Sequence, residues 1–364
     1  MTVTLRVAIN AFFQRHLSTG TGQYMSHLLS TLCAQGGAHE YLVIGGLGDG
    51  GSSNLSKIWL EQVEAPRRAA SLGADVLHYP YFAAPLFSPV PVVVTIHDLI
   101  PILLPAYHGS ALVRLYTALA AAGARRARLV LADSESTRTD VVARLGVAPG
   151  RVRVVLLAPS PRFRQPISEA EQASVRERYA LPPHFVLYVG GLDQRKNVPR
   201  LVEAFAQARR QWHLPHYLVI LGARRPHSAF FPDPARAAAR AGVDKEVLFP
   251  GHVPEHDLPA FYSLADAFAY PSRYEGFGLP PLEAMACGTP VVCSGVSSLP
   301  EVVGDAGLLV PPDDTKAWAE ALATILTDQS LREELKLRGR ERARRFSWER
   351  TAEETLRAYQ EAAG

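Results

Sequence analysis

Two glutamates, Glu275 and Glu283, stand with seven residues between them in the stretch YPSRYEGFGLPPLEAMACGTPVVC. In a chain with 35 acidic residues such an interval arises readily by chance, and two solvated carboxylates would then be expected. The setting favours function. A buried strand, Ala267–Tyr270, ends shortly before Glu275, and a helix is expected to begin at Pro280–Pro281 and to end at Gly288. The pair therefore flanks a strand-to-helix turn.

The turn itself, Gly276–Phe277–Gly278, is suited to an anion. Backbone N–H groups and the positive end of the helix dipole attract negative charge at such a turn, and glycines let a ligand approach the backbone closely. We expect Glu283 in the first turn of the helix, where its carboxylate can accept hydrogen bonds from two vicinal hydroxyls. A diol beside a phosphate is a ribose, so this stretch predicts a nucleotide site.

A basic pair follows another expected strand. After Phe185–Val189 come the residues GGLDQRKN, which contain Arg195 and Lys196, and then an amphipathic helix, Val198–Arg209. Two cations at a strand-to-helix junction can neutralise a diphosphate. Taken alone, the stretch is equally consistent with a solvated basic pair on a loop.

The first half of the chain offers two weaker signals. His97 and Asp98 follow a very apolar strand, and the carboxyl edge of a parallel sheet is where doubly wound proteins bind ligands. This position favours a functional histidine over a core histidine bonded to a backbone carbonyl. Gly20 and Gly22 lie in a Gly- and Thr-rich loop before an expected helix, Gln23–Leu32, which is more often a flexible turn than a phosphate loop.

The elements that must position these residues alternate between short apolar runs and helical stretches, which is typical of α/β proteins with parallel sheets. The chain has 364 residues, of which 48% are hydrophobic and 20% charged, so about two domains are expected. Two sets of expected strands predict two doubly wound sheets. They are Leu5–Ile9, Tyr41–Gly45, Val76–Tyr79, Val92–Ile96, Leu129–Ala132 and Val152–Leu156, then Phe185–Val189, Tyr217–Leu221, Val247–Phe249, Ala267–Tyr270, Pro290–Cys293 and Leu308–Val310.

A proline-rich connection, Ala158–Pro183, separates the two sets. We therefore predict an N-terminal domain over residues 1–165 and a C-terminal domain over residues 166–347. The last helix, residues 348–364, follows a break at Phe346 and is expected to pack back on the first domain.

The net charge of +3 is too small to indicate a nucleic-acid partner and fits a small anionic ligand. The N-terminus lacks the features of a secretory signal, and no apolar run reaches membrane-spanning length. The 3 cysteines form no C-x-x-C pair, which favours a reducing, cytoplasmic location.

Two other motifs carry less weight. His252, Glu255 and His256 match the H-x-x-E-H pattern of some zinc peptidases, but Pro254 lies within the motif and makes a continuous helix improbable. The series Gly46, Gly48 and Gly51 matches G-x-G-x-x-G, although it follows the second strand and not the first. An NAD-dependent oxidoreductase is therefore a weak alternative.

Together, E-G-F-G-L-P-x-L-E-A-M-A-C-G-x-P-V-V, the preceding G-G-L-D-x-R-K-N and the strand-end H-D resemble glycosyltransferase family four. Its members are retaining, nucleotide-sugar-dependent enzymes with the GT-B fold, an α/β fold of two Rossmann-like domains facing across a cleft. The resemblance spans most of the chain. It is most specific from Phe249 to Pro312 and loose before His97.

The resemblance implies roles for individual residues. Glu275 would contact hydroxyls of the transferred sugar, Glu283 the ribose, and His97 the donor sugar, with Lys196 the third residue expected to be catalytic. Many members carry an arginine where this chain has Gly191. The expected substrate-binding residues are Gly20, Gly22, Arg195, Lys196, Val253, Gly276, Phe277, Gly278, Leu279 and Glu283.

The segment His97–Pro105 is similar to members that transfer mannose from GDP-mannose, and we expect that donor with a saccharide or lipid-linked saccharide acceptor. No metal or other cofactor is expected, because the chain has no D-x-D triplet and its basic residues already supply positive charge. A catalytically silent nucleotide-sugar-binding protein is the main alternative. A cluster of Arg125, Arg126 and Arg128 suggests peripheral contact with an anionic membrane as a further alternative to solvated helix-end arginines.

Overall fold

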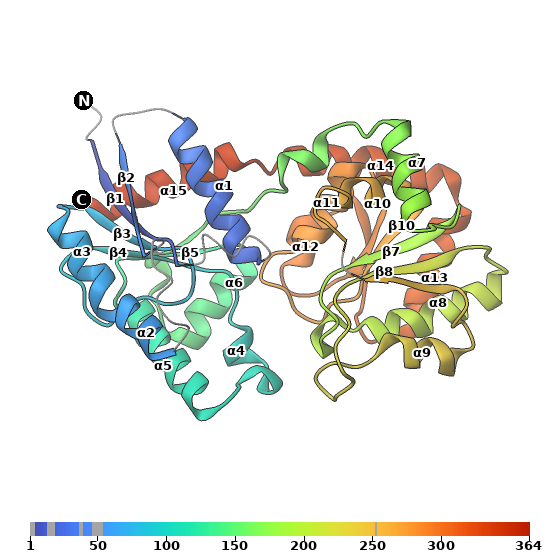
Figure 1. Ribbon diagram of the computed structural model, residues 1–364, viewed down its shortest axis with the longest axis horizontal. Helices are drawn as coiled ribbons and strands as arrows, with labels where there is room; N and C mark the ends of the chain where they lie inside the picture. The colour runs from blue at the N-terminus through green and yellow to red at the C-terminus, as the bar shows by residue number, and fades with distance from the viewer. Residues whose placement is uncertain (1–3, 13–18, 36–38, 46–53, 252) are drawn as a thin grey trace. The chain divides into compact units, whose positions relative to one another are not determined.

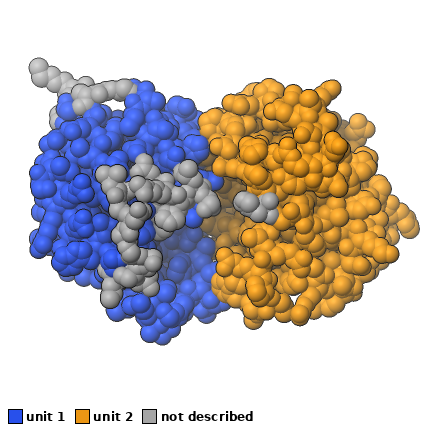
Figure 2. All heavy atoms as spheres, in the orientation of Figure 1, with its two compact units in different colours: residues 1–157, 347–364 blue, residues 158–346 orange. Residues whose placement is uncertain are grey.

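The structure is a computed structural model that describes residues 4–12, 19–35, 39–45, 54–251 and 253–364. The chain divides into two compact units, residues 1–157 with 347–364 and residues 158–346, which Figure 2 shows in two colours. Each unit contains one sheet in the described part of the chain. No helix of these described segments is long and apolar enough to cross a membrane.

The first unit is built on a parallel sheet whose six described strands run in the order β2-β1-β3-β4-β5-β6. Helices connect most of these strands along the chain (Figure 1). The strands are β1 (Arg6–Asn10), β2 (Glu40–Ile44), β3 (Val76–Tyr79), β4 (Val92–Ile96), β5 (Leu129–Ala132) and β6 (Val152–Val154). The α-helices are α1 (Gly20–Ala34), α2 (Asn54–Trp59), α3 (Ala65–Ser71), α4 (Ile100–Leu103), α5 (Ala111–Arg126), α6 (Glu135–Asp140) and α15 (Trp348–Ala363).

The second unit repeats this plan, with six described strands in the order β12-β11-β10-β7-β8-β9. The strands are β7 (Phe185–Val189), β8 (Tyr217–Leu221), β9 (Val247–Gly251), β10 (Ala267–Tyr270), β11 (Val291–Ser294) and β12 (Gly307–Val310). The α-helices are α7 (Glu169–Arg178), α8 (Val198–Trp212), α9 (Pro234–Ala241), α10 (Leu258–Leu264), α11 (Leu279–Cys287), α12 (Leu299–Val303), α13 (Thr315–Thr327) and α14 (Gln329–Arg344).

The central strands of both parallel sheets are buried on both faces, because the helices that connect parallel strands cover the sheet. Every residue of β3, β4, β5 and β10 is buried, as expected for strands that helices cover on each side. The predicted α/β fold is confirmed. The strands β3, β4, β5, β7, β8 and β10 have the predicted bounds, and the others differ by one or two residues at one or both ends.

The last helix, α15, belongs to the first unit and lies beside α1 (Figure 1). Its Trp348 ring stacks on His27, with ring centroids 4.9 Å apart. Its Tyr359 is fully buried, and the Tyr359 hydroxyl lies 2.7 Å from Nδ1 of His78 in β3. The end of the chain thus completes the core of the unit in which the chain begins.

Candidate active site

The basic pair follows β7 in a short, tightly held connection to α8. Gly190, the first residue after the strand, has φ of +155°, and a Cβ there would lie 2.9 Å from the Tyr188 hydroxyl. A 3₁₀ turn, Gln194–Lys196, then ends at Asn197, whose left-handed backbone (φ +57°) starts α8. This connection turns the side chain of Lys196 inward, where it is only 9% exposed.

Lys196 and Arg195 meet Glu275 at the carboxyl edge of the second sheet. The strands β7 and β10 are neighbours and run parallel, so the segments that follow them emerge at the same edge. Lys196 Nζ lies 2.6 Å from Oε1 of Glu275 and 2.5 Å from the Tyr270 hydroxyl. A guanidinium nitrogen of Arg195 lies 2.8 Å from the same carboxylate oxygen. The structure therefore brings together three of the predicted residues.

The charges in this cluster decide its protonation. Burial by itself would raise the pKa of Glu275, but the cations of Lys196 and Arg195 outweigh burial and lower that pKa to about 2. Burial lowers the pKa of the Lys196 ammonium, and the Glu275 carboxylate partly offsets this effect. The cluster thus holds the Glu275 carboxylate between two cations, and the carboxylate of Asp193 lies 3.8 Å from Arg195. The two positive and two negative charges balance, and Lys196 and Arg195 supply the N–H donors that an anionic group requires.

The loop after Glu275 is fixed by hydrogen bonds from the start of α12. Ser298 Oγ donates to the carbonyl oxygens of Glu275, at 2.9 Å, and Phe277, at 2.5 Å. The amide of Glu275 donates to Ser297 Oγ at 2.9 Å. Gly278 caps α11 with φ of +122°, and a Cβ there would lie 2.8 Å from Leu299 Cδ2, so only glycine fits this close approach. The predicted residues Gly276 and Leu279 lie on either side of this fixed turn.

Glu283 does not lie in the first turn of α11, and that prediction is wrong. The helix begins at Leu279, so Glu283 is in its second turn, with Pro280 and Pro281 occupying the first. The Tyr262 hydroxyl donates to Oε2 of Glu283 at 3.0 Å. Burial raises the pKa of Glu283 to about 7. The two glutamates therefore differ sharply in charge near neutral pH, which their spacing did not indicate.

Val253, also predicted to bind substrate, follows β9 and is 8% exposed. The H-x-x-E-H motif that includes it is not helical in its described part, because β9 ends at Gly251 and α10 begins at Leu258. His252 itself lies outside the described residues, as do Gly46, Gly48 and Gly51 of the G-x-G-x-x-G match.

His97 belongs to the first unit, at the carboxyl end of β4. Its Nδ1 lies 2.7 Å from Oδ2 of Asp133, and its Nε2 lies 3.2 Å from the carbonyl oxygen of Pro80. Burial lowers the pKa of His97, but the Asp133 carboxylate outweighs it, so the pKa is raised overall. Since both ring nitrogens face acceptors, the arrangement favours the imidazolium form. Asp98, beside it, accepts the Ile100 amide at 3.0 Å and so starts α4.

Gly20 and Gly22 are not in a loop, and the expected start of their helix at Gln23 is wrong. The helix α1 begins at Gly20, and the Thr19 side chain caps it by accepting the Gly22 amide at 3.1 Å. The capping threonine was overlooked because the glycines suggested a flexible turn. Their role in substrate binding stays a prediction, and one of the two amides already has a partner.

The sequence analysis missed three residues that contact predicted ones. Tyr270 contacts Lys196, Tyr262 contacts Glu283, and Asp133 contacts His97. Asp133 could have been found, because it directly follows β5, which neighbours β4. Acidic residues after adjacent parallel strands lie at one edge of a sheet. The two tyrosines gave no such signal, since strand and helix tyrosines are usually core residues.

Comparison with known proteins gives two family matches. Residues 20–157 match glycosyltransferase family 4, and residues 171–342 match the glycosyl transferases group 1. O-antigen chain mannosyltransferase B of Escherichia coli is 36% identical over 298 residues, which cover 81% of this chain and 77% of that protein. The serotype-specific mannosyltransferase WbdA of Escherichia coli is 32% identical over 70% of this chain, which spans only 32% of WbdA.

Solved structures match over nearly the whole chain. Sucrose-phosphate synthase from Thermosynechococcus elongatus superposes with a TM-score of 0.76 at 24% identity, covering 98% of each chain. HepE of Anabaena, solved in complex with UDP-glucose, gives a TM-score of 0.70 at 18% identity and covers 97% of this chain and 98% of its own. At these identities the likeness shows the fold. With the family matches and the relative at 36% identity, the chain belongs to glycosyltransferase family 4 and is a glycosyltransferase with the GT-B fold.

Proposed function

We propose that this glycosyltransferase moves mannose from GDP-mannose to a saccharide or lipid-linked saccharide acceptor, with retention of anomeric configuration and without a metal. The observation that carries the proposal is the buried cluster of Lys196, Arg195 and Glu275 at the carboxyl edge of the second sheet. Such an edge is the ligand-binding edge of doubly wound sheets. The ammonium and guanidinium groups of this cluster can donate hydrogen bonds to a ligand that brings negative charge.

In the proposed reaction the diphosphate leaves as the bond to the sugar stretches, and negative charge grows on it. Lys196 and Arg195 meet that charge with groups that are already in position, which is a large catalytic contribution. Both cations contact Glu275. The donor phosphate then accepts hydrogen bonds from the same two cations as the carboxylate does. The remaining lone pairs of the Glu275 carboxylate accept hydrogen bonds from the sugar hydroxyls. The leaving phosphate oxygen takes the proton of the acceptor hydroxyl on the front face of the sugar.

His97 is proposed to contact the donor sugar from the first unit. Its Nδ1 is held by the Asp133 carboxylate, which fixes the ring orientation. Nε2 faces only a backbone carbonyl, at 3.2 Å, and a sugar hydroxyl can replace that acceptor. Glu283 is proposed to accept hydrogen bonds from the ribose hydroxyls. This role needs its ionised form, which a pKa of about 7 makes available in neutral and alkaline solution.

The choice of mannose rests on the relatives, because O-antigen chain mannosyltransferase B and WbdA are mannosyltransferases by name. A nucleotide-sugar donor is supported by HepE, which has this fold and was solved with UDP-glucose. Contact with an anionic membrane stays a prediction. Two of the three arginines behind it donate to backbone carbonyls, Arg125 to Leu145 and Arg126 to Leu86.

The test combines binding with turnover. Thermal unfolding would be followed with GDP, UDP, ADP and their mannose and glucose derivatives, because a ligand that binds the folded state raises its stability. We expect the largest increase with GDP and GDP-mannose, slow release of GDP through donor hydrolysis, and an α-configured mannose at the earliest times by NMR. Stabilisation without any GDP release identifies a silent binding protein. Preference for a uridine donor contradicts the choice of GDP-mannose.

A further inference from the structure

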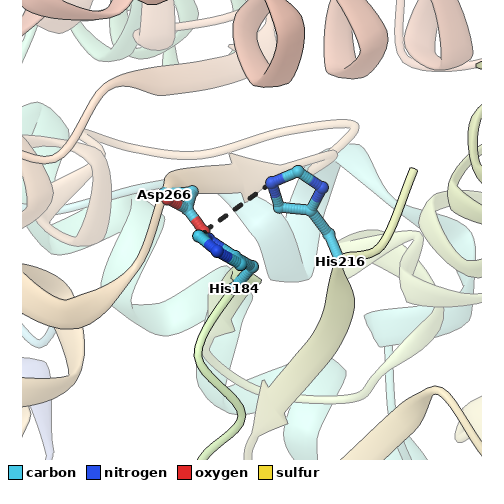
Figure 3. Close-up of side chains that lie close together, drawn as sticks. All are labelled: His184, His216 and Asp266. Carbon is cyan, nitrogen blue, oxygen red and sulfur yellow. Dashed lines mark hydrogen bonds and ion pairs between the residues drawn. The ribbon is translucent and has the colours of Figure 1, made fainter.

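Three side chains that the proposed reaction does not use cluster at the other edge of the second sheet. His184, His216 and Asp266 each directly precede a strand, namely β7, β8 and β10. These strands are neighbours in the order β10-β7-β8, so their amino ends lie together. Figure 3 shows the two imidazole rings and the carboxylate converging on one point. Lys196 and Glu275 follow the carboxyl ends of β7 and β10, at the opposite edge.

The spacing of the three ligand atoms approaches that of a metal site. Bonds of about 2.0–2.1 Å from a tetrahedral zinc ion leave its ligand atoms about 3.4 Å apart. Nδ1 of His184 lies 3.3 Å from Oδ2 of Asp266, and Nε2 of His216 lies 3.7 Å from the same oxygen. All three ligand atoms lie within 4.8 Å of one another.

The backbone holds two of the ligands in register. The Phe185 amide donates to Oδ2 of Asp266 at 3.1 Å, and the Asp266 amide donates to the Phe185 carbonyl at 3.0 Å. The Tyr217 amide, next to His216, donates to the His184 carbonyl at 3.0 Å. Hydrogen bonds between the starts of neighbouring strands therefore hold the three residues close together. The His184 side chain is 57% exposed and that of His216 is 9% exposed, so an ion can enter from the His184 side and keep a water as its fourth ligand.

The two arginines near the cluster are held by other groups. Of the two nearby arginines, Arg209 pairs with Glu246 at 3.5 Å. Arg332 donates to the carbonyls of Ile325 and Leu326. A simpler arrangement, in which Asp266 is only the counter-ion of a protonated histidine, predicts no affinity for metal.

We propose that His184, His216 and Asp266 form a binding site for a divalent transition-metal ion, with zinc the best match. Two imidazole nitrogens, one carboxylate oxygen and a water make a four-coordinate set that zinc prefers. The ion braces the amino ends of β7, β8 and β10. Because the transfer chemistry is assigned to the other edge of the sheet, loss of this ion should weaken the fold without abolishing turnover.

The test uses the full-length chain without a histidine tag, after dialysis against a chelator. Zinc binding would be measured by calorimetry, and cobalt(II) would report a four-coordinate site through its visible absorption. We expect one zinc ion per chain and a higher unfolding temperature with zinc. His184→Gln, at an exposed position where the variant should fold, should weaken zinc binding by more than about tenfold, and Asp266→Asn should do the same. His213→Asn is the matched control. His213 is an exposed histidine in the loop that precedes β8 and contains His216, and its left-handed backbone is one that asparagine tolerates.

Equal zinc affinity in the wild-type chain and His184→Gln would overturn the proposal. So would an unfolding temperature that changes with pH but not with zinc, which is the result expected of a plain histidine–carboxylate ion pair. Magnesium serves as a negative probe because it prefers oxygen ligands, and stabilisation by magnesium equal to that by zinc would also contradict the assignment.

Discussion

At the scale of single residues, Lys196 and Glu275 act as each other's counter-ion at 2.6 Å, with Arg195 as the second cation. The pair lies 79 residues apart in sequence and meets only because β7 and β10 are neighbours. This arrangement stabilises two cations in a largely buried place. A change of any one of the three residues therefore alters the electrostatic environment of the other two.

The first prediction concerns the basic pair. Lys196→Ala should reduce kcat by roughly a hundredfold to a thousandfold, the effect of losing one preorganised stabilising group, with a smaller rise in the KM of the donor. Arg195→Ala should reduce kcat less, because its guanidinium also donates to the Tyr274 carbonyl at 2.7 Å and so has a structural share. Lys316→Ala, at a site 78% exposed, is the control. Near-native kcat in folded Lys196→Ala would reject the electrostatic role.

The second prediction concerns Glu283, whose pKa of about 7 is raised from 4.5 by burial. Between these values the folded state holds a proton that the unfolded state releases, so this group's contribution to stability is present below pH 4.5 and is lost as pH rises through 7. Glu283→Gln should therefore exceed the wild type in unfolding free energy by about 1–3 kcal/mol at pH 8, and by little at pH 5. Chemical denaturation at both pH values measures this difference. An equal difference at both pH values would show that the pKa of Glu283 does not lie between them.

The same glutamate gives a binding control. GDP affinity of the wild type should rise as pH passes through about 7, because the ionised carboxylate is the better acceptor for ribose hydroxyls. Glu283→Gln should lose this pH dependence. Glu275→Ala should keep it while losing turnover, since Glu275 is assigned to the sugar.

The third prediction concerns Asp133, a positioning residue for His97. Asp133→Asn removes the charge that raises the pKa of His97, so the imidazolium is lost at lower pH. The alkaline limb of the kcat/KM profile should then move to lower pH. His97→Ala should abolish that limb, and an unmoved limb in Asp133→Asn would mean that His97 does not produce it.

At the scale of elements, the start of α11 fixes the loop that carries Glu275. The helix begins at Leu279, and its N-cap Gly278 has a backbone conformation that favours glycine and lies directly against Leu299 of α12. Two serines before α12 bind the same loop. The position of the carboxylate thus depends on the packing of two helix ends.

The fourth prediction concerns Gly278, the N-cap of α11. Gly278→Ala should lower both stability and kcat, because φ of +122° is strained for alanine and its Cβ would lie 2.8 Å from Leu299 Cδ2, so the loop that bears Glu275 would be pushed. Gly242→Ala is the control for an ordinary left-handed glycine with open space around it. Gly242 also has positive φ, +68°, but no atom lies within 4 Å of its added Cβ, so it should lose only about 1 kcal/mol and keep its kcat. Equal effects on kcat would show that packing at α12 is unimportant.

At the scale of the whole molecule, the two units carry different parts of the proposed chemistry, with Lys196 and Glu275 in one and His97 in the other. The proposed metal site lies in the second unit, at the opposite edge of the sheet from Lys196 and Glu275. Metal effects on stability and on turnover should therefore separate.

The fifth prediction follows from this separation. Treatment with EDTA should leave the rate of sugar transfer unchanged. If the purified protein carries a metal ion at the His184 site, EDTA should also lower its unfolding temperature. A rate that falls with EDTA and returns with magnesium or manganese would overturn the proposed metal-independent transfer. The rates must be measured well below the unfolding temperature, so that loss of stability is not mistaken for loss of catalysis.

The sequence was sufficient for the order of elements because each buried strand is a short apolar run with a clear break at its end, as in Phe185–Val189. It was insufficient where a single side chain decides a boundary, as Thr19 does for α1. Contacts that depend on strand order could not be predicted from the sequence either. Neither the Lys196–Glu275 ion pair nor the grouping of His184 with Asp266 follows from spacing along the chain, because both need the adjacency of β7 and β10.

The placement of α15 in the first unit has a consequence for synthesis on the ribosome. Residues 158–346 emerge complete before residues 347–364, so the unit that begins first is finished last. Until then, the face of β3, β4 and β5 that α15 covers remains bare, and His78 lacks the Tyr359 hydroxyl. The nascent first unit therefore exposes apolar surface, to which chaperones can bind, until residues 347–364 have been synthesised.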